Sequence, residues 1–89
     1  MKQYVFPAVF FKEDEKYTVA FPDLNIFTDG DSLLETFLFA KSYLKEFVKY
    51  SLKYDMDIEQ PTPLEKLKGR FGDQIIMFVD AIVPATQED

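Results

Sequence analysis

The chain has 89 residues, which corresponds to one domain spanning residues 1–89, because single-core domains typically contain roughly 50 to 200 residues. Hydrophobic residues make up 47% of it, with ten Phe and five Tyr to bury, and the lack of Cys and His excludes a disulfide and effectively excludes a structural zinc site. Ten basic against sixteen acidic residues give a net charge of −6, which weighs against direct nucleic-acid binding and suits a basic partner, although acidic chains are also commonplace.

The amino-terminal segment, MKQYVFPAVFFKEDEK, contains a short apolar run that is broken by Pro7 and followed by charges. It lacks the long apolar region and small-residue cleavage site of a signal peptide. No stretch of the sequence approaches the ~18 apolar residues of a membrane span. We therefore expect a cytoplasmic protein with no membrane partner and no cofactor.

The first half of the chain predicts strands. Residues 4–12, YVFPAVFFK, are apolar on both faces, which is typical of a strand inside a covered sheet or at an interface. Pro7 lacks a backbone donor and indicates a bulge or an unpaired stretch. Residues 12–15, KEDE, are expected to form a charged hairpin loop before a second, alternating strand at residues 16–21, KYTVAF. Residues 26–28 suffice for a short third strand.

Three aspartates surround the entry to the next hydrophobic run: Asp23, Asp29 and Asp31. They are either metal-binding or catalytic carboxylates, or the turn and cap residues that any helix entry needs. Asp29-Gly30 is typical of a turn in which glycine adopts positive φ. Ser32, with Glu35 three residues later, forms a capping box. Local structure therefore accounts for all these acidic residues except Asp23.

The hydrophobic periodicity from Ser32 to Tyr54 predicts a long amphipathic helix. Its expected core stripe is Leu33, Phe37, Ala40, Leu44, Phe47, Val48 and Ser51. If Phe37 is central, Phe37→Ala should cost about 3–5 kcal/mol. Beside this stripe run four aromatic residues: Phe39, Tyr43, Tyr50 and Tyr54. They form either the margin of a wide core, with the Tyr hydroxyls in water, or a surface for an oligomer or another partner.

The last third of the chain predicts a connector and a final strand. Thr62 is expected to cap a short connecting helix that begins at Pro63 and stops at Gly69. Residues 75–83, IIMFVDAIV, are apolar on both faces apart from Asp80 and predict the last strand. The polar residues that follow are expected to fray.

The predicted order is β-β-β-α-(short α)-β, an α+β domain with a mostly antiparallel four-stranded sheet and one long helix on one face. Nothing else in the chain obviously covers the other face, and an uncovered apolar face or exposed edge requires a partner. The interface candidates are Tyr43, Tyr50, Phe78 and Ile82. Asp14 and Glu15 in the hairpin loop either steer a basic partner or are ordinary solvated loop charges.

Four segments, in order, resemble the HicB-like antitoxin family. YVFPAVFFKEDEKYTVAFPDL resembles the opening hairpin with its Phe-Pro-Asp-Leu-like end, TDGDSLLET resembles the Gly-Asp-Thr/Ser helix start, FAKSYLKEFV resembles the helix, and the Pro-rich segment fits the stretch before the last strand. The likeness covers about residues 4–83. It implies a partial ribonuclease-H-like fold and an antitoxin that oligomerises, as a dimer or larger assembly. It also implies that a small basic mRNA-cleaving toxin of the HicA type is neutralised by occlusion, in a toxin-antitoxin system.

The chain departs from the family in two places. Family members usually continue past the last strand into a segment that binds operator DNA, whereas this sequence stops at Asp89, so we expect no DNA-binding domain. After the Phe-Pro-Asp-Leu element, Asn25-Ile26-Phe27 replaces a Pro-Gly-Cys-like turn.

Two alternatives to the antitoxin remain open. One is a stand-alone, self-associating structural protein without a toxin. The other is a metal-dependent nuclease, which would need several carboxylates to converge on two metal ions. Its candidate ligands would be Asp23, Asp29, Asp31 and Asp80. Because His and Cys are lacking for acid–base or nucleophilic chemistry, we expect the chain not to be an enzyme.

Overall fold

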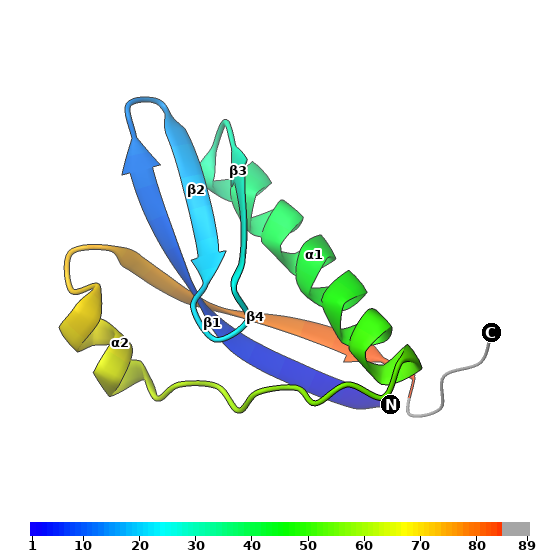
Figure 1. Cartoon of the computed structure of the whole chain (residues 1–89). Helices are drawn as coiled ribbons and strands as arrows, with labels where there is room; N and C mark the ends of the chain where they lie inside the picture. The colour runs from blue at the N-terminus through cyan, green and yellow to red at the C-terminus, as the bar shows by residue number, and fades with distance from the viewer. Residues whose placement is uncertain (85–89) are drawn as a thin grey trace.

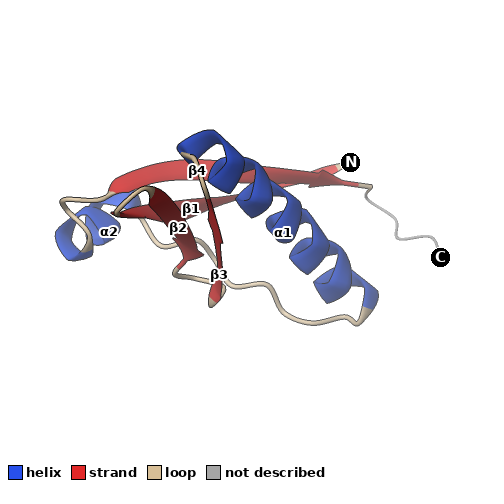
Figure 2. Cartoon of the chain, turned by 90° about the horizontal axis from the view of Figure 1, so that it is seen from above, coloured by secondary structure: helices blue, strands red, loops and turns tan. Residues whose placement is uncertain are grey.

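A computed structural model of the chain describes residues 1–84. The elements follow the predicted order: β1 (Lys2–Glu13), β2 (Lys16–Phe21), β3 (Ile26–Gly30), α1 (Leu33–Lys53), α2 (Leu64–Arg70) and β4 (Ile75–Val83). The strands form one antiparallel sheet in the order β3-β2-β1-β4, and α1 lies across one of its faces (Figures 1 and 2). The predicted α+β class is confirmed, while the polar tail expected at 85–89 lies outside the described residues.

The β1–β2 hairpin determines which backbone groups of the sheet point outward. Glu13 pairs with Lys16 across a two-residue loop. Such a hairpin closes on a hydrogen-bonded pair, so odd-numbered residues of β1 bond toward β2 and even-numbered residues toward β4. Pro7, which cannot donate, stands opposite Phe78 with its nitrogen facing away from β4, and pairing with β2 begins only at Val9. The unpaired stretch predicted at Pro7 is present, and the register continues without a bulge.

The core lies between the sheet and α1. Helix residues Ala40, Leu44 and Val48 are fully buried at its centre. The sheet supplies Phe6, Ala8, Phe10, Val19, Phe21, Val79, Ala81 and Val83. The predicted phase of the helix is confirmed, but Phe37 is only partly buried, so it is not central as expected. Thr36, which the prediction left out, is buried instead, with its hydroxyl donating to the Ser32 carbonyl at 2.7 Å.

The start of α1 confirms the predicted cap and corrects the predicted turn. Ser32 Oγ accepts from the Glu35 N–H at 3.0 Å, and the Glu35 carboxylate accepts from the Asp31 N–H at 2.7 Å, one residue before the usual capping-box partner. Gly30 ends β3 and does not have positive φ. A Cβ on Gly30 would lie 2.5 Å from Thr36 Oγ1, so the glycine is needed where strand and helix approach closely.

The sheet face opposite α1 is partly covered, which corrects the expectation that nothing covers it. Val9, which points to that face, and Leu67 of α2 are both fully buried. The ring of Phe71, the residue that ends α2, meets Phe11 edge-on at a centroid distance of 5.9 Å. Figure 1 shows α2 beside the start of β4, far from α1. The short helix therefore shields one end of the sheet and is more than a connector.

The segment that leads to α2 also differs from the prediction. Helix α2 has Pro63 at its N-cap without a side-chain cap, and it runs through Gly69 to Arg70. Thr62 is not a cap: its backbone N–H donates to Asp23 Oδ2 at 2.9 Å, and its hydroxyl donates to Asp23 Oδ1. Asp23, the one acidic residue without a predicted local role, therefore holds this segment against the β2–β3 loop.

Candidate functional site

Two strips of exposed apolar side chains remain, one at each outer strand of the sheet. The β4 strip consists of Val5, Phe78 and Ile82, which are 40%, 52% and 47% exposed. Val5 pairs with Asp80, and Phe78 and Ile82 lie two residues to either side of Asp80 on the same face, opposite α1. These exposed fractions leave this part of the sheet face open to a partner.

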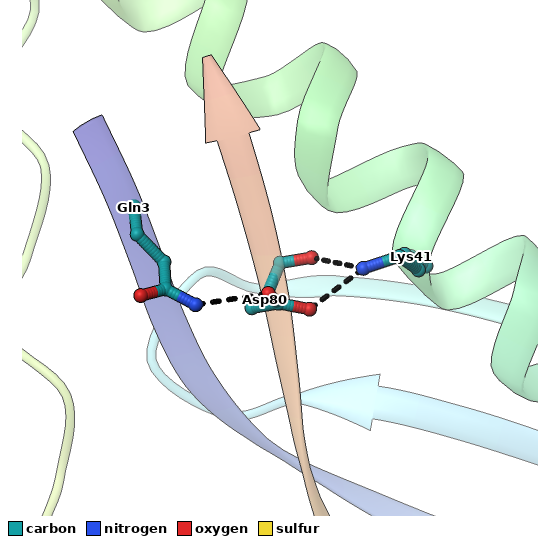
Figure 3. Close-up of polar contacts among 3 residues, drawn as sticks. All are labelled: Gln3, Lys41 and Asp80. Carbon is teal, nitrogen blue, oxygen red and sulfur yellow. Dashed lines mark hydrogen bonds and ion pairs between the residues drawn. The ribbon is translucent and has the colours of Figure 1, made fainter. Parts of the chain in front are cut away.

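Asp80 lies in the middle of the β4 strip and is held by two neighbours. Lys41 of α1 places its Nζ 2.6 Å from Asp80 Oδ1 and 3.0 Å from the Asp80 carbonyl, and Gln3 Nε2 donates to Oδ2 at 3.0 Å (Figure 3). These hydrogen bonds, the one from Lys41 first, hold the pKa of Asp80 below its ordinary value of 3.8. Because Lys41 donates a hydrogen bond to the outward-facing carbonyl of Asp80, it also protects this edge against the addition of another strand.

The β3 strip consists of Phe27, Phe39 and Tyr43, which lie along the other outer strand and the adjoining side of α1. Phe27 is 70% exposed, and it lines a shallow hollow of about 420 Å³ together with Tyr43, Thr18, Thr28 and Asp29. The alternation of backbone bonds continues from β2 to β3, so Phe27 and Asp29 direct their N–H and C=O groups outward. This edge therefore combines free backbone groups with exposed aromatic rings.

The charged side chains around the β3 strip are mainly acidic. A second hollow, of about 250 Å³, adjoins the first and contains Phe39. Its other lining residues are Lys16, Asp29, Gly30, Asp31 and Glu35. Three carboxylates against one ammonium group leave this end of the strip negative, which favours a positively charged partner.

The structure places the six predicted interface residues on three separate surfaces. Phe78 and Ile82 belong to the β4 strip, and Tyr43 belongs to the β3 strip. Tyr50 is 58% exposed on the same side of α1, where its ring lies 4.7 Å from that of Tyr54.

Asp14 and Glu15 are exposed at the tip of the β1–β2 hairpin, and Asp14 has φ 57°. Sequence reasoning missed Phe27 and Val5. The signal for Phe27 was an aromatic residue between Ile26 and Thr28, whose alternation would have turned its ring away from the core.

The candidate nuclease carboxylates do not converge. Asp23 is bound to Thr62, and Asp80 is bound to Lys41 and Gln3. Within residues 1–84, no group of three or more His, Cys, Asp or Glu side chains is placed to hold a metal ion. The structure therefore offers the nuclease hypothesis no site in this part of the chain. No helix among the described residues is long and apolar enough to span a membrane.

The fold is found among the proteins of toxin-antitoxin systems. The sequence matches no protein-family model and no curated protein. Among solved structures, a chain of a toxin-antitoxin complex from Streptococcus pneumoniae superposes with a TM-score of 0.80 and 20% identity, over 91% of this chain and 70% of that one. A chain of the HicA3 and HicB3 toxin-antitoxin complex gives a TM-score of 0.65 and 17% identity, over 90% of this chain and 100% of that one.

More particularly, the fold is that of HicB. The antitoxin HicB of Burkholderia pseudomallei superposes with a TM-score of 0.77 and 21% identity, over 96% of this chain. This chain spans 65% of the length of that antitoxin. The HicB-like fold implied by the sequence resemblance is therefore confirmed.

Proposed function

We propose that this protein is an antitoxin, a non-enzymatic binding module that neutralises a small basic mRNA-cleaving toxin of the HicA type by covering it. It would act in the cytoplasm as one component of a toxin-antitoxin system. The observation that best supports this function is the shared fold with HicB, together with the two matching chains from toxin-antitoxin complexes.

The surface chemistry of the chain suits inhibition by occlusion. Such a function needs no reactive groups, but it needs exposed apolar area to anchor a partner and charge to attract it. The two strips supply apolar area, and the net charge of −6 would speed encounter with a basic protein. We assign Asp14 and Glu15, at the hairpin tip, to this long-range attraction. The same negative charge disfavours direct binding of DNA or RNA.

We further propose that the chain forms a dimer or larger homo-oligomer through the β4 strip. Copies that each carry −6 repel one another, so a self-contact is favoured where local charge is cancelled. The β4 strip fits this requirement because Asp80, its one carboxylate, is neutralised by Lys41. This strip is also the observation that favours the second candidate function, a self-associating structural protein without a toxin.

Co-expression tests the antitoxin function. The gene is expressed with a tag, together with the neighbouring gene, which we expect to encode a small basic toxin, and expression of that toxin alone is expected to arrest growth. The proposed function predicts that growth is restored and that the two proteins co-purify. If growth remains arrested and the tagged chain elutes alone, the antitoxin function is refuted, and analytical ultracentrifugation then decides whether the structural alternative holds. A chain that sediments as a monomer would exclude that alternative as well.

A further inference from the structure

We propose that the outer edge of β3 is the toxin-docking surface, and that it receives an extended basic segment of the toxin as a fifth strand of the sheet. This inference rests on the proposed function and specifies the surface that performs it. Three features of the β3 edge support it: its free backbone groups, the aromatic rings on both sides of it, and its charge.

The two edges of the sheet differ in their readiness to accept a strand. At the β4 edge, Lys41 already donates to the outward carbonyl of Asp80. At the β3 edge, Phe27 and Asp29 direct N–H and C=O groups outward, and within residues 1–84 no side chain bonds to them. Natural sheets commonly use lysine and charge to block strand addition, and recognition by strand addition uses an edge that is left open. The open edge is therefore that of β3.

The side chains at this edge are arranged to contact an added strand on both of its faces. Phe27 lies on the sheet face opposite α1, whereas Tyr43 projects from α1 on the other face, and both line the same hollow. Successive side chains of a strand point to opposite faces. One set of the incoming side chains would therefore pack on Phe27 and the other set on Tyr43, and aromatic anchors of this kind dominate binding energy at many interfaces.

The charge at this edge selects a basic occupant. Asp29, Asp31 and Glu35 line the adjoining hollow, with Lys16 as the one basic residue among its lining residues. A strand that carries Lys or Arg would meet these carboxylates at favourable distances. A second copy of this chain is disfavoured there, because antiparallel pairing of two β3 edges would bring the same acidic residues together.

The test uses calorimetry to measure the dissociation constant of the complex between the full chain and the toxin that co-purifies with it on co-expression. Phe27→Ser, which changes a 70% exposed ring, should raise Kd by about tenfold or more. Leu38→Ser, which changes a 53% exposed apolar side chain of α1 that belongs to neither strip, is the control and should leave Kd within about twofold.

A second pair of variants tests strand addition itself. Asp29→Ala removes the carboxylate, and Asp29→Pro removes both the carboxylate and the outward N–H. Proline is tolerated at an outward-facing edge position, so Asp29→Pro should fold, as circular dichroism will show. It should bind more weakly than Asp29→Ala, by about threefold or more, because one backbone hydrogen bond to the added strand is lost.

Each outcome decides a different claim. If Phe27→Ser binds as tightly as wild type, or if Leu38→Ser weakens binding as much as Phe27→Ser does, the β3 edge is not the docking surface, although the antitoxin function stands. Equal affinities for Asp29→Pro and Asp29→Ala would refute strand addition. If Asp29→Pro does not fold, hydrogen exchange of the Asp29 amide replaces it, and the absence of added protection in the complex has the same meaning. If the wild-type chain does not bind the toxin, the proposed function and this inference both fail.

Discussion

Lys41 and Asp80 connect the long helix to the outer strand β4, with Nζ 2.6 Å from Oδ1 and 3.0 Å from the backbone carbonyl oxygen. The side chains are 46% and 35% exposed, so the ion pair contributes little to stability by itself. Its main consequence is at the sheet edge, where it occupies a backbone acceptor that another strand would need. This contact is what makes the two edges of the sheet chemically different.

The contribution of this ion pair to the free energy of unfolding should decrease at acid pH. Folding lowers the pKa of Asp80 below its ordinary value of 3.8, chiefly through the hydrogen bond from Lys41. The unfolded chain therefore binds the proton more readily, and the contribution is complete above about pH 5 and is lost as the pH falls through the folded-state pKa. Urea unfolding of wild type and Asp80→Asn should show a difference at pH 7 that shrinks toward pH 3. A difference that is constant or grows in acid would contradict this assignment.

Truncation of Leu44 should destabilise the protein far more than truncation of another leucine on the same helix. Leu44 is fully buried and Leu38 is 53% exposed. Leu44→Ala should lower the free energy of unfolding by about 3 kcal/mol, and Leu38→Ala by less than about 1 kcal/mol. Phe37→Ala should cost ~2 kcal/mol rather than the larger value expected of a central residue, because Phe37 is only partly buried. Chemical denaturation measures all three, and equal losses for the two leucines would mean that the helix phase is wrong.

Gly30→Ala should destabilise the protein, although alanine is the better former of regular structure. The new Cβ would lie 2.5 Å from Thr36 Oγ1, so the first turn of α1 must shift. We expect a loss of about 1–3 kcal/mol. Gly69→Ala in α2 is the matched control, since no atom outside its own stretch of helix lies within 4 Å of the new Cβ, and it should be neutral or stabilising by up to ~1 kcal/mol. Thermal melts of both variants give the comparison, and a stabilised Gly30→Ala would contradict the close approach.

The sequence alone predicts the features that depend on local periodicity. The period of 3.6 residues places Ala40, Leu44 and Val48 on the buried face of α1, and the spacing of Ser32 and Glu35 predicts the cap. These patterns are repeated over a long element or are confined to one turn, so they do not depend on the rest of the fold. The succession of strands and helices along the chain follows from similar short-range signals.

Long-range contacts could not be predicted in the same way. Asp23 and Thr62 are 39 residues apart, and a local rule assigned Thr62 to a cap that it does not form. Gly30 looks like a turn residue until the position of Thr36 shows that it is needed for packing. Helix α2 has only seven residues, too few for its periodicity to reveal that Leu67 covers the far face of the sheet.

The packing of α2 has its own test. Leu67 is fully buried, so Leu67→Ala should cost about 2–4 kcal/mol and should loosen α2 from the sheet. Hydrogen exchange is expected to show faster exchange in α2, while amides at the centre of α1 are much less affected. If α2 keeps its protection and stability is unchanged, the helix is not the cover of this face.

Inhibition of the proposed toxin in a purified system tests the central claim most directly. The small basic toxin is incubated with RNA, and this chain is added in increasing amounts while cleavage is followed. Occlusion predicts that cleavage falls in proportion to the added chain and stops near stoichiometric amounts, and that the chain alone leaves the RNA intact and unbound. Undiminished cleavage in the presence of a large excess of the folded chain would contradict the antitoxin function.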